Sequence, residues 1–499
     1  MMNLPFLAAT PESNLCELDD PQTLARVSQR MAEQYQEPFI YHLERAVNTI
    51  EQDDPNYYAR FPRSLITTCN VRTFISGTGS SIYDKLIPLL EDTEHELILV
   101  TCFWAPSVSR DALNDVLRKL SDKAVRRGTN KIRVRLCFSS SSVFQKLFHK
   151  QTASGQTYPA SEWVKKFGLP DSSELGGLDL KIKSVFILPF SVMHPKFITV
   201  DRQVVVLPSC NVSWEEWFEG AITMTGPILT QFLKFYWTFW ERRAESPHNL
   251  PERKRITTVP ATESERPSTM PSAGQTAAIG VEGTPAFFLP SPHRQNPNFR
   301  PFGSASAPTT PLNAFLLTLF VKAERSLRIQ TPNLTAPPVL SALLKALARG
   351  IDVTILTSAR LMILEQLVTA GTTTSRCVKA LVKRYKALEP RATSRVYDEE
   401  AAMTPAKIGK LHISYFEPRH GYKKRGEEQG EPQQSHLKVT IVDGEVLVLG
   451  SGNLDRASWF TSQELGVAFF GTEVVREVEG AVNKAMTGRS RVMFDSETQ

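Results

Sequence analysis

The chain has 499 residues, of which 41% are hydrophobic and 22% charged, and its formal net charge is +6. These values are typical of a folded globular protein with more than one domain, and the small positive charge is compatible with anionic substrates without identifying one. The six cysteines are scattered and form no C-x-x-C pair, which argues against a zinc ribbon or a thiol redox motif and favours a reducing compartment.

The sequence shows no targeting or membrane-spanning segment. The N-terminal residues MMNLPFLAATPESN lack the basic region and the full apolar stretch of a signal peptide. No run reaches the roughly 18 uncharged apolar residues that a membrane-spanning helix needs. We therefore expect an intracellular protein, soluble or peripheral to a membrane, that meets any lipid substrate from the aqueous side.

The first elements in chain order are a helical lead-in and a β–α–β unit. Residues 1–70 are predicted as the lead-in, because apolar positions in Leu24–Ile50 recur on one helical face. The apolar run Leu97–Phe103 predicts a buried strand, Asp111–Arg127 an amphipathic helix and Ile132–Phe138 the next strand. This order predicts a parallel sheet with helices on its faces.

The same order returns in the second half of the chain. Ser326–Thr331 is predicted as a strand, Val339–Ala348 as a helix and Ile351–Leu356 as the following strand. An internal repeat of this size indicates duplication. We therefore expect a first domain over residues 71–245, a second domain over residues 312–487, and a short tail over residues 488–499.

Two irregular stretches interrupt this plan. Residues 246–311 hold twelve of the 33 prolines and many Ser, Thr and Ala residues, which predicts a linker or a long surface loop. Residues 419–435 are charged and contain glycine, and they precede a candidate motif. This second stretch is predicted as a surface loop beside the site, and a solvated insertion without function is an equal alternative.

Two matching polar motifs dominate the sequence. HPKFITVD provides His194, Lys196 and Asp201, and HLKVTIVD provides the second set; both fit H-x-K-x4-D. A single match would be weak evidence, whereas a pair is strong evidence for one composite site. The second set comprises His436, Lys438 and Asp443.

Further polar residues follow each motif at matching positions. Ser209 and Asn211 follow the first motif, and the equivalent residues Ser451 and Asn453 follow the second, so that 436−194 and 453−211 both equal 242. Two glutamates come later, with a spacing that differs by three residues. They are Glu219 and Glu464.

The motif residues are predicted at the ends of strands. Strand alternation places each motif His and Lys on the same face, and the strands that follow carry Ser and Asn to their ends, as suits an active site on a rigid sheet edge. The alternative is a set of satisfied core polar groups in a degenerate repeat. Buried Lys and Asp side chains are costly unless they are paired or used, which favours the functional interpretation.

These motifs resemble the duplicated HxKxxxxD and GSxN signature of the phospholipase D superfamily over roughly residues 70–485. In the second half TPNLTAP, ARGIDVTIL and GSGNLDRASWFTSQELGV are similar to the cardiolipin synthase-like branch. The resemblance implies an α/β fold: two α/β/α sandwich domains related by a pseudo-twofold axis, with the active site at their interface. The sequence departs from the pattern at Pro208, where glycine is usual, and it lacks the preceding membrane helices and any PX or PH domain.

The resemblance also implies a mechanism. His194 is expected as the nucleophile that forms a phosphohistidine, and His436 as the general acid and base, although the near symmetry of the halves leaves this order open. The two motif lysines would hold the nonbridging oxygens, and the serines and asparagines would add neutral donors. The two motif aspartates are expected to orient the imidazoles, with Glu219 and Glu464 either supporting them from behind or forming structural ion pairs. No metal or other cofactor is required, because the Lys and His cations supply the charge.

The expected substrate is a phospholipid, with water or an alcohol as acceptor and with peripheral membrane contact. The aromatic residues in 214–240 support it if some of them line an acyl-chain entrance, but a buried helix face is the favoured interpretation of Phe232–Trp240. A nuclease is the alternative, since Arg376–Lys386 and Lys423–Arg425 are basic, although solvated surfaces explain both segments better. A non-catalytic membrane-binding or scaffold protein is the third hypothesis. The sequence leaves the oligomeric state, the headgroup and the balance of hydrolysis and transfer open.

Overall fold

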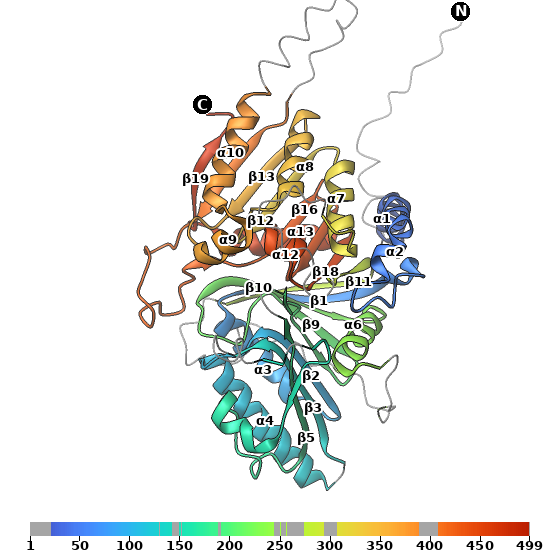
Figure 1. Ribbon diagram of the computed structural model, residues 1–499, viewed down its shortest axis with the longest axis vertical. Helices are drawn as coiled ribbons and strands as arrows, with labels where there is room; N and C mark the ends of the chain where they lie inside the picture. The colour runs from blue at the N-terminus through green and yellow to red at the C-terminus, as the bar shows by residue number, and fades with distance from the viewer. Residues whose placement is uncertain are drawn as a thin grey trace, which may run out of the picture.

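A computed structural model describes residues 21–128, 130–141, 149–150, 152–187, 191–243, 250, 256, 274–293, 307–388 and 408–498. The chain forms a mixed α/β structure in which the first half lies below the second in the view of Figure 1. Four long strands from both halves (β10, β1, β11 and β18) cross the middle of the molecule and join the halves through continuous pairing.

One sheet runs through both halves with the same strand order on each side of its centre. The order is β5-β3-β2-β8-β9-β10-β1 and then β11-β18-β17-β16-β12-β13-β14. The first-half strands are β1 (Ile66–Gly77), β2 (Glu96–Phe103), β3 (Ile132–Ser140), β5 (Leu178–Ser184), β8 (Phe197–Val200), β9 (Val204–Pro208) and β10 (Trp217–Thr225). The second-half strands are β11 (Gln275–Ser291), β12 (Ser326–Thr331), β13 (Asp352–Thr357), β14 (Leu411–Phe416), β16 (Val439–Val442), β17 (Val446–Gly450) and β18 (Glu464–Phe470). Short strands complete the edges and the centre: β4 (Gln156–Tyr158) beside β5, β19 (Ser490–Asp495) beside β14, and β15 (Gln434–Ser435) beside β10.

The helices repeat the same plan at equivalent points of the two halves. A helix follows the first strand of each half, another follows the next strand, and a third follows the last. In the first half these are α3 (Gly79–Glu91), α4 (Val108–Arg127) and α6 (Ile228–Tyr236), and in the second half α7 (Pro311–Lys322), α8 (Pro337–Ala348) and α13 (Thr472–Met486). The second half adds α9 (Ile363–Ala370), α10 (Thr374–Lys386) and α12 (Arg456–Phe460). No helix in the described part of the chain is long and apolar enough to cross a membrane.

The elements expected from hydrophobic periodicity are confirmed to within a few residues. The two strands and one helix of the second-half repeat appear as β12, β13 and α8, and those of the first-half unit as β2, β3 and α4. Helix α4 has a local reason to begin and end where it does. Ser107 accepts a hydrogen bond from the Arg110 amide and caps α4, and Gly128 ends that helix in the left-handed conformation that glycine adopts at low cost.

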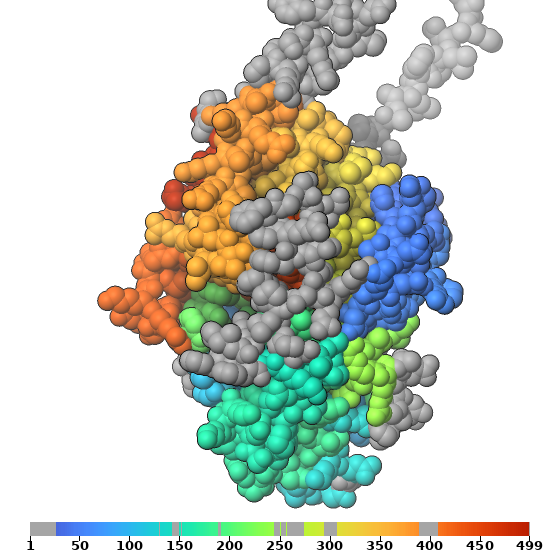
Figure 2. Space-filling model, viewed as in Figure 1, coloured from blue at the N-terminus to red at the C-terminus, as the bar shows by residue number. Residues whose placement is uncertain are grey.

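The lead-in helix α1 (Pro21–Arg45) packs on the second half of the chain, and Figure 2 shows the blue N-terminal part of the chain directly against yellow atoms of the second half. Phe39 stacks on Phe287 at 5.7 Å between ring centroids and meets Phe315 edge-on at 5.3 Å. The helix is followed by α2 (Val47–Ile50), and β1 begins at residue 66, so the expected boundary at residue 70 falls inside a strand. Residues 1–20 lie outside the described residues.

The predicted linker over residues 246–311 is wrong for residues 275–291, which form β11. This strand pairs with β1 on one side and β18 on the other, and its last eight residues are buried. The run Ala286-Phe287-Phe288-Leu289 drives this burial, and averaging over the Pro- and Ser-rich surroundings hides it. Residues 257–273 and 294–306 of the predicted linker lie outside the described residues.

The main hydrophobic core crosses the boundary between the halves. It joins apolar side chains of β1, β10 and α6 to those of β11, β18, α1 and α7 in one cluster. A second cluster lies between α3, α4 and the first-half sheet. Because protein interiors are close-packed and resist deformation, a core shared by both halves fixes their relative position. Any site between the halves is therefore held on a rigid frame.

Candidate active site

The two motif histidines meet at the junction between the halves. Their ring centroids are 6.3 Å apart and the rings are nearly perpendicular, at 80°. Each histidine lies just before its strand, since β8 begins at Phe197 and β16 at Val439. A phosphate group is of the right size to lie between two imidazoles at this separation.

Each motif is fastened to the opposite half by backbone hydrogen bonds. The His194 amide donates to the carbonyl of Gln463 at 3.0 Å, and the Gln463 amide donates to the carbonyl of Val192 at 2.8 Å. In the other direction, the amides of His436 and Leu437 both donate to the carbonyl of Phe218, at 2.9 and 3.0 Å. The position of each imidazole is thus set by the half that does not carry it.

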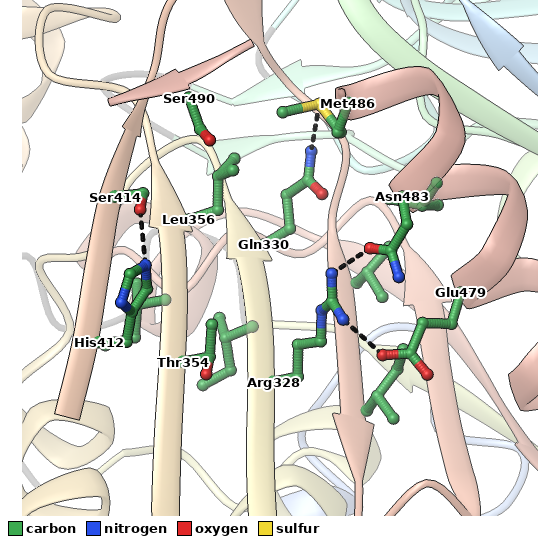
Figure 3. Close-up of a pocket in the computed structure, with 15 residues that line it drawn as sticks. Arg328, Gln330, Thr354, Leu356, His412, Ser414, Glu479, Asn483, Met486 and Ser490 are labelled. Atoms are coloured by element: carbon green, nitrogen blue, oxygen red, sulfur yellow. Dashed lines mark hydrogen bonds and ion pairs between the residues drawn. The ribbon is translucent and has the colours of Figure 1, made fainter. Parts of the chain in front are cut away.

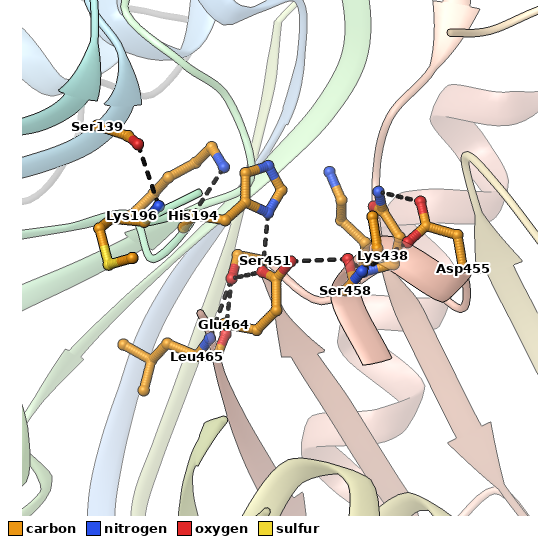
Figure 4. A network of polar contacts seen from close by, with 12 residues as sticks. Ser139, His194, Lys196, Lys438, Ser451, Asp455, Ser458, Glu464 and Leu465 are labelled. Atoms are coloured by element: carbon orange, nitrogen blue, oxygen red, sulfur yellow. Dashed lines mark hydrogen bonds and ion pairs between the residues drawn. The ribbon is translucent and has the colours of Figure 1, made fainter. Parts of the chain in front are cut away.

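The two glutamates also reach across the junction, and each pairs with the histidine of the opposite half. Glu464 Oε2 lies 2.8 Å from His194 Nδ1, and Glu219 Oε1 lies 2.7 Å from His436 Nδ1. Figure 4 shows the first pair, with the ring of His194 above the carboxylate. Both glutamates are buried. Glu464 is the first residue of β18, and Glu219 lies near the start of β10. A carboxylate at Nδ1 fixes the ring orientation and directs Nε2 towards the substrate, as in histidine-based hydrolases.

The motif serines hold the glutamates and do not offer free donors to a substrate. The Ser451 hydroxyl donates to Glu464 Oε2 at 2.5 Å, and the Ser209 hydroxyl donates to Glu219 Oε2. A hydroxyl has a single proton to donate, so the expectation that these serines bind the substrate directly is wrong. Each serine oxygen also accepts a hydrogen bond of 3.0 Å from a backbone amide, that of Leu465 for Ser451 and that of Gly220 for Ser209.

The expectation that the motif aspartates orient the imidazoles is also wrong. Asp201 accepts hydrogen bonds from the amides of residues 94, 95 and 96 at 2.7 to 2.8 Å. Asp443 accepts from the amides of residues 324, 325 and 326 at 2.7 to 3.0 Å. Both aspartates sit at positive φ, 48° and 56°, in the tight turns that follow β8 and β16. Asp tolerates this conformation, and its side chain ties the turn to the chain entering the neighbouring strand.

Burial governs the protonation of the central groups. Burial lowers the pKa of His436 to about 3 and also lowers that of His194, in both cases outweighing the opposite effect of the partner glutamate. Burial likewise lowers the pKa of Lys438 to about 7. Pairing with the histidines outweighs burial in the glutamates, so the pKa values of Glu219 and Glu464 fall below the ordinary value. With no anion bound, both imidazoles are therefore neutral at pH 7, while both carboxylates are charged.

The motif lysines lie beside the histidines that precede them. Lys196 Nζ donates to the carbonyl of His194 at 3.0 Å, and Lys438 Nζ donates to that of His436 at 2.6 Å. Lys438 Nζ is also 2.9 Å from His436 Nε2. Both side chains are buried, and neither contacts a carboxylate within ion-pair distance among the described residues. A bound anion would supply the missing countercharge for these two ammonium groups.

A cavity of about 610 Å³ opens onto both histidines. This volume is within the usual range for small-molecule sites. It is lined by both motif asparagines and by apolar side chains from both halves, and these apolar residues include Phe103, Phe186, Val192, Met362, Leu364 and Val368. Within the described ranges, no group of three or more His, Cys, Asp or Glu side chains is placed to hold a metal ion.

Two cavity residues, Asp455 and Glu215, were not predicted from the sequence as parts of the site, and a third, Trp217, was predicted only as one of the aromatic residues that could line an acyl-chain entrance. Asp455 receives the Asn453 side-chain amide at 3.0 Å and caps α12, and Glu215 lines the cavity from the first half. Trp217 packs over His436 at 4.7 Å between ring centroids. Asp455 lies two residues after the predicted asparagine and Trp217 two residues before a predicted glutamate, so closeness in sequence was the available signal.

The aromatic segment, the charged loop and the basic helix predicted from the sequence lie outside the group of motif residues. The aromatic side chains of Phe232–Trp240 are mostly buried in the main core, which confirms the helix-face interpretation. Residues 419–433 form an exposed loop that leads into β15 and then into His436. The basic side chains of α10 are exposed on a solvated helix face.

A second cavity, of about 170 Å³, lies between β12, β13, β14 and α13 (Figure 3). Arg328 pairs there with Glu479 at 2.6 Å and also bonds Asn483, and His412 Nε2 is 3.0 Å from the Ser414 hydroxyl. The motif residues do not line this cavity. The polar side chains that line this cavity hydrogen-bond to one another, so we interpret them as structural and not as a ligand site.

Comparisons with known proteins agree with this description. Residues 316–486 match the family model of the cardiolipin synthase, PLD-like domain. Phosphatidylserine synthase of Haemophilus influenzae Rd KW20 is similar in structure, with a TM-score of 0.50 and 14% identity over 89% of this chain and 94% of that one. A comparison with curated proteins found no match.

Two further solved structures are similar at lower scores. Nuc, a phospholipase D family member of Salmonella typhimurium, has a TM-score of 0.23 and 18% identity over 36% of this chain and 90% of that one. Polyphosphate kinase of Porphyromonas gingivalis has a TM-score of 0.42 and 10% identity over 88% of this chain and 53% of that one. At these identities the similarity to the Haemophilus enzyme supports the fold alone.

Proposed function

We propose that this chain, a phospholipase D superfamily protein whose residues 316–486 form a cardiolipin synthase-like domain, cleaves or transfers the phosphodiester of a phospholipid at one site shared by its two halves. The observation that carries this proposal is the crossed pairing of Glu464 with His194 and of Glu219 with His436 at one cavity. Two imidazoles held in this way can act on one phosphorus atom in succession. The repeated strand order, from β1 to β10 in the first half and from β11 to β18 in the second, supports two duplicated domains related by a pseudo-twofold axis.

In the first step, Nε2 of His194 attacks phosphorus and the bond from phosphorus to the leaving oxygen breaks. The protonated imidazole of His436 donates its proton to that oxygen, so the alcohol leaves neutral. His194 is assigned as the nucleophile because its side chain is 14% exposed at the cavity, whereas that of His436 is 3% exposed. Binding of the anionic substrate stabilises the imidazolium form of His436, which allows that residue to carry the required proton while His194 attacks in its neutral form.

In the second step, neutral His436 accepts a proton from water or an alcohol, whose oxygen attacks phosphorus and breaks the bond to His194. The product is a phosphatidic acid with water, or a new phosphodiester with an alcohol. Each imidazole carries positive charge at some stage, and its partner glutamate stabilises that charge. Lys196 and Lys438 neutralise the nonbridging oxygens, and Asn211 and Asn453 provide neutral donors at the cavity wall.

The apolar share of the cavity wall favours a lipid over a nucleic acid. Phe103, Phe186 and Val192 from the first half face the same space as Met362, Leu364 and Val368 from the second. These apolar side chains offer contacts to hydrocarbon and have no hydrogen-bond donors for a phosphate backbone. The match of residues 316–486 to a cardiolipin synthase, PLD-like domain supports the same substrate class.

Incubation of the purified protein with labelled phosphatidylcholine, phosphatidylglycerol and single-stranded DNA, in the presence of ethanol, tests this function. We expect phosphatidylethanol from at least one lipid, formed by the unchanged chain and absent with His436→Ala. Cleavage of DNA without lipid turnover would replace the proposal by a nuclease. Absence of turnover of all three by a protein that binds lipid would favour the non-catalytic alternative.

A further inference from the structure

The helix α9 has its polar and apolar sides reversed relative to an ordinary surface helix. Its polar residues Gln366 and Thr369 are buried, at 3% and 7% exposure. Its large apolar residues face outward, with exposures of 41% for Ile363, 75% for Leu364, 40% for Leu367 and 44% for Val368. A surface helix normally buries its apolar stripe against the core, so an outward stripe indicates an apolar partner.

The buried polar side of α9 is firmly anchored and is not a folding defect. The Gln366 side chain donates to the carbonyl of Leu361 at 2.6 Å and accepts from the amide and the hydroxyl of Thr374 at 2.6 and 2.9 Å. The Thr369 hydroxyl donates to the carbonyl of Glu365 at 2.7 Å. The Thr369 bond closes within the helix, whereas the Gln366 bonds join α9 to the residues on either side of it and hold the rotation that keeps the apolar residues outside.

The apolar side of α9 is continuous with the cavity that reaches the histidines. Met362, Leu364 and Val368 line that cavity together with His194 and His436. The helix follows β13, at the carboxyl edge of the parallel strands of the second half, where ligands bind in open α/β sheets. In Figure 1, α9 lies next to α12, whose residues Ala457 and Ser458 also line the cavity.

Basic residues flank this helix on both sides in the chain. Arg360 precedes it and Arg376 follows it at the start of α10, and both are exposed. Further along α10, Lys379, Lys383 and Arg384 are exposed as well. Glu365 is the single charged residue within α9 itself. An apolar stripe flanked by cations is the arrangement by which proteins contact an anionic lipid surface.

We propose that α9 is the element that docks this protein on a lipid surface, with its apolar side among the acyl chains and with Leu364 and Val368 guiding one chain of the substrate into the cavity. The inference rests on the proposed function, because a lipid substrate is what joins the surface to the cavity. A second copy of the chain, covering the same stripe, is the outcome that would replace it.

The test compares two double variants in which the same number of exposed apolar side chains is removed. Ile363→Ser with Leu367→Ser alters the outer side of α9 and spares the cavity wall. Val125→Ser with Val321→Ser is the matched control, since these residues are 63% and 66% exposed on α4 and α7. Binding is measured by co-sedimentation with vesicles of equal parts phosphatidylcholine and phosphatidylglycerol, and turnover with the soluble diester bis(p-nitrophenyl) phosphate.

We expect the α9 variant to bind vesicles at least about tenfold more weakly than the unchanged chain, with unchanged turnover of the soluble diester, and the control variant to retain both. Equal vesicle binding by both variants would overturn the docking proposal, as would light scattering that shows the α9 variant losing a dimer without losing vesicle binding. Turnover of the soluble diester by the unchanged chain tests the enzymatic function separately. Its absence, with vesicle binding still dependent on α9, would remove the enzymatic function and leave the docking surface.

Discussion

Substitution of either His194 or His436 by Ala is expected to lower phospholipid turnover by about 10⁴-fold or more, equivalent to roughly 5 kcal/mol of lost transition-state stabilisation. The effect is large because one imidazole forms the bond to phosphorus and the other moves the proton, so neither can replace the other. Turnover is measured as phosphatidylethanol formation at saturating ethanol. The two single variants and the double variant should be similarly inactive, because the two residues act as one unit.

Loss of a buried imidazole also removes one of the two kinds of partner of its glutamate and leaves only serine hydroxyls, so folding must be followed in parallel. His436→Gln is a useful second variant, because its side chain retains an N–H group that can bond to Glu219. His412→Ala is the matched control. His412, in β14, also pairs with a carboxylate, that of Asp495 at 3.2 Å, but it does not line the active-site cavity. Retention of more than a hundredth of the activity by folded His436→Gln would contradict the two-imidazole mechanism.

Substitution of Glu219 or Glu464 by Gln is expected to lower turnover by about 10²- to 10⁴-fold while leaving the fold intact. The amide keeps the shape of the carboxylate but removes the charge that stabilises the imidazolium form of the partner histidine. Removal of that charge lowers the pKa of the histidine further. With Glu219→Gln, the general acid His436 therefore loses its proton at lower pH, and the alkaline limb of the kcat profile moves to lower pH.

The motif aspartates provide the control that separates these roles. Asp443→Asn weakens three hydrogen bonds from backbone amides to a charged acceptor, which predicts a loss of stability of about 1–3 kcal/mol in denaturant unfolding. Its turnover per folded molecule should stay within a few-fold of the unchanged chain, with an unshifted pH profile. If Asp443→Asn moved the pH profile and Glu219→Gln did not, the crossed pairing would have no catalytic part.

Much of the fold could be predicted from the sequence because its signals are local. Short apolar runs bounded by proline and glycine identified β2, β3, β12 and β13, and helical periodicity identified α4 and α8. The long strand β11 was missed because its eight buried residues lie in a segment whose average composition is that of a linker. The strand exists because β1 and β18 offer it partners from both halves, and no local pattern reports that.

The sequence indicated which residues belong to the candidate site, but not which of them hydrogen-bond to one another. The constant offset of 242 predicted the histidines and lysines as one group, since repeated spacing can be read without knowledge of the fold, and the structure brings the two imidazoles to 6.3 Å between ring centroids. The partners of the imidazoles could not be derived in this way, because each glutamate serves the histidine of the opposite half. The family resemblance led to the expectation that Asp201 orients His194, whereas the partner in the structure, Glu464, is 270 residues away.

The claim on which everything depends is that two histidines act in turn on one phosphorus atom, through a covalent intermediate. The stereochemical course at phosphorus tests it most directly, with a phospholipid made chiral at phosphorus by oxygen isotopes and converted to phosphatidylethanol. Two successive in-line displacements each invert the centre, so the account predicts overall retention of configuration. Overall inversion would show a single direct displacement and would contradict the account.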